Sequence, residues 1–252
     1  MLAVLSPAKT LDFNPQSLTR RGSQPELLDD ARLLAAKLQT LSPAKFAKLM
    51  GISERLSAEV HGYFTDWKGE GTKPAILAFQ GDVYQGLEAG DFTAEDFAFA
   101  QDHLRILSGL YGVLRPLDRI EAYRLEMGTK LTTPRGKTLY DFWGDKITTL
   151  INRALAKQKD DVLVNLASNE YFRAIDPKQL QATVITPAFK EYRSGGYKIL
   201  SFFAKKARGQ MARYLIKNQL TQPEDLQNFR EDGYRFNPQL SSDTNWVFTR
   251  KQ

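Results

Sequence analysis

The sequence contains no cysteine and only two histidines, His61 and His103, which lie far apart along the chain. Without cysteine the protein can form neither a disulfide nor a thiolate metal site, and it cannot be a thiol peroxidase. Two isolated histidines do not provide a typical zinc site, a haem with paired histidines or a catalytic triad. We therefore predict no cofactor and no resident metal. A metal site made of carboxylates alone stays open, although Lys and Arg neighbours would compete with a cation at its candidates: Asp82, Asp118, Glu126 and Glu170.

Long apolar runs and nucleotide-binding loops are also missing. No apolar run reaches 20 residues, and Met1-Leu-Ala-Val-Leu5 lacks the basic start and length of a signal peptide. No phosphate loop of the GxxxxGK[ST] type is present, and no GxGxxG follows a predicted strand. The sequence predicts a cytoplasmic protein without a membrane partner. With 42% hydrophobic residues among 252, the chain has enough apolar side chains for a sizeable core.

Positive charge is concentrated in the second half of the chain. Residues 1–126 hold 14 Lys/Arg and 17 Asp/Glu, whereas residues 127–252 hold 21 and 12. The net charge of the whole chain is +6. Such an asymmetry raises the expectation of a polyanionic partner.

One stretch, residues 103–128, combines a buried strand with glycines and dense charge. Leu104 to Leu107 is an apolar run that predicts a strand ending at Ser108-Gly109. Arg115, Arg124 and Glu126 follow within about twenty residues. Charged residues after a strand end are typical of binding sites in α/β proteins. The alternative, a tight connection held by structural Arg–carboxylate pairs, stays open.

Other predicted strands also end in polar residues. Lys9 follows the short strand 2–5, Asp82 follows a strand predicted at 75–79, and Glu170 follows a strand at 162–166. If these strand ends meet, they would form a cleft that could process a phosphate-bearing substrate. The candidates for this cleft are Lys9, Asp82, Arg115, Arg124, Glu126 and Glu170, with Lys205 beside them.

Residues 42–64 predict two short helices joined by Gly51-Ile52-Ser53. Pro43 suits the first position of a helix, Gly51 suits a left-handed helix end, and Ser53 can cap the next helix. This pattern is similar to a helix-hairpin-helix, which presents backbone N–H groups to a DNA phosphate. The predicted contacts are Lys45, Lys48, Gly51 and Ser53. A purely structural αα-hairpin is an equal alternative, because the usual second glycine is replaced by Ser53.

A basic helix is predicted at 204–218. It has no acidic residue of its own, so its cations cannot pair along the same helix. We predict an electropositive ridge suited to phosphates, against the alternative of a solvated lysine face. Its candidate DNA contacts are Lys205, Lys206, Arg208 and Arg213.

The order of elements predicts an α/β (mixed α+β) fold, a central mixed sheet flanked by helices, with the 42–64 hairpin projecting from it. The antiparallel parts are a hairpin around residues 194–196 and a late strand, 246–249. A capping box at Ser23-Gln-Pro-Glu26 predicts the start of a helix, and 138–157 predicts a single long helix.

Several blocks resemble the YaaA family of bacterial peroxide-stress-resistance proteins. They lie in order along nearly the whole chain: Ser6-Pro-Ala-Lys-Thr-Leu11, Phe79-Gln-Gly-Asp-Val-Tyr-Gln-Gly-Leu87, Ser108-Gly-Leu-Tyr-Gly-Val-Leu-Arg-Pro-Leu-Asp118, Tyr123-Arg-Leu-Glu-Met-Gly128, Leu163-Val-Asn-Leu-Ala-Ser168, Glu170-Tyr-Phe172 and Ala204-Lys-Lys-Ala-Arg-Gly-Gln-Met211.

The resemblance implies a single YaaA-type domain over residues 1–252, and a role in peroxide stress through lower free iron and binding of duplex DNA. We expect a monomer that binds duplex DNA in a basic cleft with little sequence preference. An enzyme acting on a nucleotide-like or phosphate-bearing substrate is the alternative, and an interaction module is a third. Nothing in the sequence shows how iron would be affected.

Overall fold

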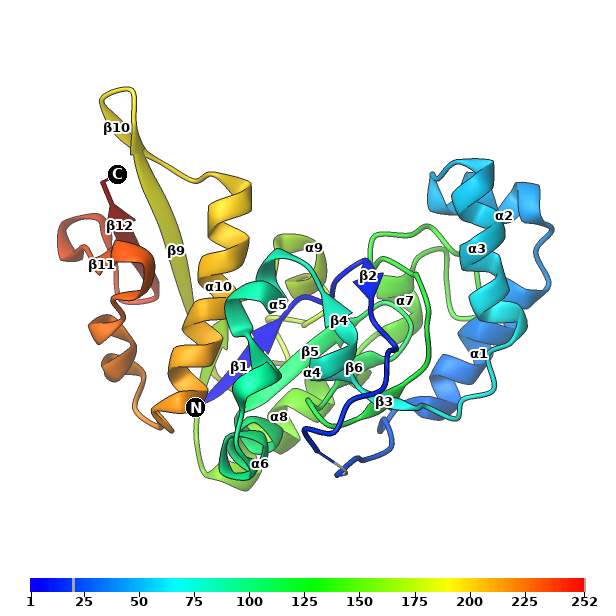
Figure 1. The fold of residues 1–252 in the computed structure, drawn as a ribbon, viewed down its shortest axis with the longest axis horizontal. Coiled ribbons are helices and arrows are strands. Elements are labelled where there is room, and N and C mark those ends of the chain that lie inside the picture. The colour runs from blue at the N-terminus through cyan, green and yellow to red at the C-terminus, as the bar shows by residue number, and fades with distance from the viewer. Residues whose placement is uncertain (20, 252) are drawn as a thin grey trace.

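A mixed β-sheet runs through the middle of the protein (Figure 1), whose computed structural model describes residues 1–19 and 21–251. Within these residues the sheet has eight strands. Their order is β11 (Arg235–Phe236), β12 (Asn245–Arg250), β9 (Thr183–Arg193), β8 (Val162–Asn165), β1 (Leu2–Leu5), β5 (Leu104–Ser108) and β6 (Gly112–Leu114), with β10 (Gly196–Lys198) paired to β9.

The central strands are parallel, and the outer pairs are antiparallel. β1 pairs in parallel with β5 and β8, and β8 with β9. The pairs β5–β6, β9–β10 and β11–β12 are antiparallel. The predicted α/β fold with a mixed sheet is therefore confirmed. The prediction that the late strand is antiparallel is largely wrong. That strand, β12, runs parallel to β9 and is antiparallel only to the two-residue β11.

Helices cover the sheet and extend beyond it. The α-helices are α1 (Leu28–Gln39), α2 (Pro43–Met50), α3 (Glu54–Thr65), α4 (Ala75–Ala78), α5 (Asp82–Leu87), α6 (Ala94–His103), α7 (Leu139–Trp143), α8 (Lys146–Gln158), α9 (Asn169–Phe172) and α10 (Ser201–Lys217). The 3-10 turns are η1 (Ala89–Asp91), η2 (Pro223–Asn228), η3 (Glu231–Gly233) and η4 (Pro238–Leu240). Two small ladders pair β2 (Thr10–Leu11) with β4 (Phe79–Gln80) and β3 (Lys73–Pro74) with β7 (Arg119–Ile120). None of the described helices is long and apolar enough to cross a membrane.

The α2–α3 pair projects at one end of the molecule, and β9 to β12 lie at the other (Figure 1). The two predicted helices are present and are joined by Gly51-Ile52-Ser53, whereas their role as a helix-hairpin-helix stays a prediction. Gly51 ends α2 in the left-handed conformation, with φ of 61°. The Ser53 side chain caps α3 by accepting a hydrogen bond from the Leu56 N–H. Phe46 and Phe64 are fully buried and join the pair to the core.

Three predicted elements are wrong. Ser23 does not cap a helix, because its hydroxyl donates to Asp118 Oδ1 at 2.6 Å and α1 begins only at Leu28. The predicted strand 75–79 is mostly the buried helical turn α4, since a short apolar run has no period that separates the two structures. The predicted helix 138–157 is two helices, α7 and α8, broken at Gly144, whose φ is 51°.

A close crossing of α5 and α10 fixes one flank of the sheet. A Cβ at Gly86 would collide with the carbonyl of Lys206, and a Cβ at Gly209 would collide with the carbonyl of Val83. Both positions therefore require glycine so that the two backbones can touch. α10 also packs on β9 and β1, so this crossing positions α5 beside the end of β1.

Candidate nucleic-acid interface

Three predicted strand ends meet at one edge of the sheet. β1, β5 and β8 are parallel neighbours, so the residues that follow them share the same edge. The Ser168 N–H donates to the Ser6 hydroxyl at 2.8 Å, which ties the end of β8 to the end of β1. The Ser108 hydroxyl, at the end of β5, lies 2.7 Å from the Tyr123 hydroxyl. Segments far apart in sequence are thus linked directly at this edge.

Four of the predicted cleft residues lie around this edge. The Glu126 carboxylate lies 3.2 Å from Lys9 Nζ and 3.2 Å from Arg124 Nε. The Glu170 carboxylate accepts a hydrogen bond from the Gly128 N–H at 2.9 Å. Lys9, Arg124 and Glu126 therefore form one ion cluster, with Glu170 next to it through the 126–128 loop.

A groove of about 780 Å³ separates this edge from the projecting hairpin. Its lining joins two sets of residues that the sequence predicts separately, the hairpin contacts and the cleft residues. The lining residues are Lys9, Lys45, Lys48, Leu49, Met50, Gly51, Glu126, Gly128, Thr129, Lys130 and Glu170. The structure therefore brings three of the four hairpin candidates, all except Ser53, and three of the cleft candidates to the same concave surface.

The cations of this groove differ in how they are neutralised. Lys9 pairs with Glu126, although its side chain remains 67% exposed. Among the described residues, no carboxylate lies within ion-pair distance of Lys45, Lys48 or Lys130. Unpaired ammonium groups around a concave surface attract anions, because no carboxylate must be displaced first.

Asp82 and Lys205 lie together outside the lining of the groove. Lys205 Nζ is 4.0 Å from Asp82 Oδ2. Asp82 is the first residue of α5, and the Tyr84 hydroxyl on the same helix donates to the Ser6 carbonyl at 3.1 Å. The α5–α10 crossing therefore sets this pair near the end of β1.

Arg115 does not join the other cleft residues. It follows β6, which runs antiparallel to β5 and so leads back to the opposite edge of the sheet. There its Nη2 donates to Asp118 Oδ1 at 2.8 Å and to the Gln24 carbonyl at 2.8 Å. A site shared by Lys9 and Arg115 is therefore excluded, and the Arg115–Asp118 pair is the structural contact that the sequence left open.

Most of the basic residues on α10 have carboxylate partners from other elements. Lys206 Nζ lies 3.0 Å from Asp232 Oδ2, and Arg213 Nη1 lies 2.7 Å from Asp91 Oδ1. Arg208 is half-buried, and burial lowers its pKa. The helix carries no acid of its own, but the fold supplies acids from η1 and η3. The predicted ridge is therefore largely neutralised.

Buried tyrosine hydroxyls line the interior side of the edge. Burial raises the pKa of Tyr84, Tyr123 and Tyr171 well above the ordinary value of a phenol. At neutral pH these hydroxyls stay protonated, so they serve as hydrogen-bonding groups rather than as bases.

Neither histidine belongs to the groove. His61 Nε2 lies 3.0 Å from the Leu41 carbonyl, and His103 Nδ1 lies 2.9 Å from the Met1 carbonyl. Burial lowers the pKa of His103, whose ring stacks on Phe99. Across residues 1–19 and 21–251, no group of three or more His, Asp or Glu side chains is placed to hold a metal ion.

A comparison with protein families gives a match over residues 1–240 to the model described as "Peroxide stress protein YaaA". The chain belongs to this family. It is 54% identical over 256 aligned positions to the "UPF0246 protein" of Teredinibacter turnerae, and 54% identical over 256 to that of Saccharophagus degradans. Both alignments cover 100% of this chain and 100% of the relative. The "UPF0246 protein" of Cellvibrio japonicus is 52% identical, with 100% of this chain and 99% of the relative covered.

Sequence reasoning missed Lys130, which lines the groove of this chain. Its signal was available, because it follows the block Tyr123–Gly128 by two residues. The reason it counts is visible only in three dimensions, where the 126–130 loop faces the hairpin that carries Lys45 and Lys48.

Proposed function

We propose that this member of the peroxide stress protein YaaA family binds duplex DNA in the groove between the α2–α3 hairpin and the sheet edge. The observation that carries the proposal is the set of unpaired lysines, Lys45, Lys48 and Lys130, around Gly51. One backbone of the duplex would lie along these ammonium groups. The groove is open rather than a closed pocket, which suits a long polyanion better than a small substrate.

The hairpin tip supports this proposal through its backbone. The first N–H groups of α3 have no carbonyl partner within the helix, and the helix dipole favours an anion at that end. A Cβ at Gly51 would meet no atom within 4 Å, so the tip is open to a partner. The Ser53 side chain already caps α3, so it stabilises the turn. We keep Ser53 as a predicted DNA contact as well.

The residue types predict binding with little sequence preference. Lysine contacts phosphate as a point charge and carries no information about base identity. The α10 candidates stay predicted DNA contacts, but we expect each of them to contribute less: Lys205, Lys206, Arg208 and Arg213. The first two and Arg213 already lie near carboxylates, and Arg208 is half-buried.

The stress role follows from the family together with this binding. Covering duplex DNA would limit the damage that iron and peroxide cause on it.

The direct test is a fluorescence-anisotropy titration of the full chain with duplexes of scrambled sequence. We expect similar affinities for all duplexes. The variant Lys45→Gln/Lys48→Gln should bind roughly tenfold more weakly, because two phosphate contacts are lost. Lys137→Gln is the matched control, since it removes a lysine that lies outside the groove lining. Full affinity of the hairpin variant would contradict the proposal.

A second candidate function is an enzyme for a nucleotide-like or phosphate-bearing substrate. The observation that favours it is the ion cluster of Lys9, Arg124 and Glu126 at the carboxyl edge of parallel strands, where α/β proteins place ligands. Its test is product analysis of nucleotides incubated with the wild type and with Glu126→Gln. Turnover lost in that variant, with DNA binding intact, would establish the enzyme. No turnover in the wild type would discard it.

A further inference from the structure

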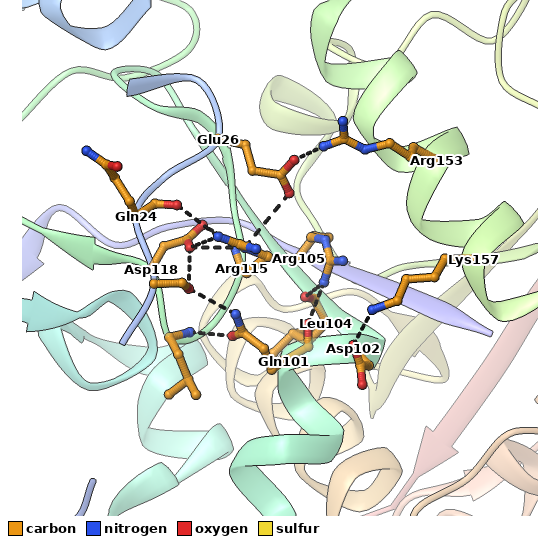
Figure 2. Close-up of polar contacts among 12 residues, drawn as sticks. Gln24, Glu26, Gln101, Asp102, Leu104, Arg105, Arg115, Asp118, Arg153 and Lys157 are labelled. Atoms are coloured by element: carbon orange, nitrogen blue, oxygen red, sulfur yellow. Dashed lines mark hydrogen bonds and ion pairs between the residues drawn. The ribbon is translucent and has the colours of Figure 1, made fainter. Parts of the chain in front are cut away.

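A second basic cavity lies at the edge of the sheet opposite the groove. It has a volume of about 550 Å³ and lies between β5, β6 and α8. Four basic side chains line it: Arg105, Arg115, Arg153 and Lys157. Figure 2 shows Arg105 between Arg115 and the two α8 side chains, with Glu26 and Asp102 nearby.

Arg105 is the distinctive residue of this cavity. Its Nη1 donates to the carbonyl oxygens of Gln101 at 2.9 Å and Leu104 at 2.7 Å. Within the described part of the chain, its Nε and Nη2 have no hydrogen-bond partner, and no carboxylate lies within ion-pair distance of it. Burial first, and then the charge of Arg115, lowers the pKa of Arg105 to about 10. At neutral pH it is therefore a charged and largely buried guanidinium without a direct counterion.

The nearby carboxylates are engaged by other cations. The buried Asp118 binds Arg115, with Nη2 and Oδ1 2.8 Å apart. Glu26 forms an ion pair with Arg153 and lies 3.8 Å from Arg115 Nε. Asp102 lies 3.4 Å from Lys157 Nζ.

The two α8 cations are held at the mouth of the cavity, where they can change partners. Arg153 and Lys157 are one helical turn apart, with side chains 65% and 78% exposed. An entering anion can therefore draw both of them from Glu26 and Asp102 at little cost, because exposed ion pairs are weak. Arg105 is already charged and in place below them.

We propose that this cavity binds a compact phosphate-bearing small molecule, with its phosphate on the free donors of Arg105 and under the side chains of Arg153 and Lys157. Guanidinium groups match phosphate oxygens with paired hydrogen bonds, and the volume is that of a small-ligand site. Leu150 and Ala154 add a small apolar wall that suits a ring attached to the phosphate. Glu26 and Asp102 at the rim would repel further phosphates of a continuous strand, so the site favours a small anion over nucleic acid.

The test is isothermal titration calorimetry of the full chain with inorganic pyrophosphate and with ADP. We expect binding of one molecule per chain. Arg105→Gln should bind about tenfold more weakly or worse, because a charge-assisted contact is lost. Arg153→Gln/Lys157→Gln should also lose about tenfold. Glu26→Gln should bind a few-fold more tightly, since the competing carboxylate is removed.

Lys137→Gln, outside the linings of both the groove and this cavity, is the matched control and should bind both probes as the wild type does. Arg105 is largely buried, so circular dichroism must show that the Arg105→Gln variant still folds. If it does not fold, the probe affinity of Arg153→Gln/Lys157→Gln, whose side chains are exposed, decides the test. Absence of binding at millimolar probe would overturn the proposal. So would loss of binding in Lys48→Gln with full binding in the α8 variant, because the anion would then lie in the groove. DNA binding does not enter this test, so the two proposals stand or fall separately.

Discussion

The α2–α3 hairpin and helix α10 both carry several cations, but the fold treats them differently. Lys45 and Lys48 on the hairpin face a groove without a carboxylate partner among the described residues. On α10, Lys206 and Arg213 bind Asp232 and Asp91, which come from distant segments. The charge that a helix offers to a partner therefore depends on acids that the rest of the chain brings to it.

Their glycines show the same contrast. Gly51 has φ of 61° and open space around it, whereas Gly209 touches the backbone of α5. Gly51 thus gives the hairpin an exposed turn, and Gly209 fastens α10 to the body of the protein. The hairpin is built as an exposed surface and α10 as a packed element.

The largest expected effect concerns this packing. Gly209→Ala places a Cβ against the Val83 carbonyl, which cannot move without shifting α5. We expect it to lower the free energy of unfolding by about 3 kcal/mol, the upper part of the usual range for overpacking. Urea unfolding measures this. A loss below about 1 kcal/mol would mean that the two helices separate easily, and the contrast with the hairpin would weaken.

The hairpin glycine should affect binding more than folding. Gly51→Val forces a β-branched residue into the left-handed region and should cost about 1–2 kcal/mol of stability. Gly51→Asn tolerates that conformation and should leave the melting temperature nearly unchanged. Both place a side chain at the tip, so both should weaken DNA binding several-fold. Wild-type affinity for Gly51→Asn would leave only a structural role for the turn.

The ion pairs of α10 should be visible in acid. The hydrogen bond from the Arg213 guanidinium is the main cause that lowers the pKa of the Asp91 carboxyl to about 2. Because the folded pKa lies below the unfolded value of about 4, the pair stabilises the fold above pH 4, and this contribution is lost as the pH falls toward 2. Arg213→Gln should therefore be less stable at neutral pH. The part of this loss that comes from the ion pair is at most about 1 kcal/mol, since Asp91 is half exposed, and it should disappear near pH 2. The part that comes from the hydrogen bonds of Arg213 to the Glu88 and Leu87 carbonyls should not depend on pH. A difference that does not depend on pH would exclude this pair as its source.

The smallest expected effect comes from an acid at the hairpin tip. Glu54 is exposed in the first turn of α3, where it stabilises the helix dipole but repels a phosphate. Glu54→Gln should raise DNA affinity about twofold while slightly lowering stability. Anisotropy and thermal melting of the same sample measure the two effects. Weaker DNA binding would place the phosphate away from this helix end.

The hairpin was predictable because its signals are local. Pro43, Gly51 and Ser53 each determine the conformation of their own turn, so the sequence alone gives the geometry. The direction of β6 is not determined by its own residues, because Gly109 and Gly112 permit either a crossover or a reversal of the chain after β5. Arg115 was therefore predicted at the wrong edge of the sheet. The pairing of α10 with Asp91 and Asp232 is not visible in its sequence either. Asp91 lies 122 residues before Arg213, and Asp232 lies 26 residues after Lys206.

The most direct test of the account is the salt dependence of DNA binding in two matched variants. Each lost phosphate contact should flatten the slope of log affinity against log salt by about 0.9. We therefore predict that Lys45→Gln/Lys48→Gln flattens the wild-type slope by nearly two units on every duplex, whereas Lys205→Gln/Lys206→Gln changes it by less than one. A large change for the α10 variant with none for the hairpin variant would contradict the account, because the duplex would then lie on α10 rather than in the groove.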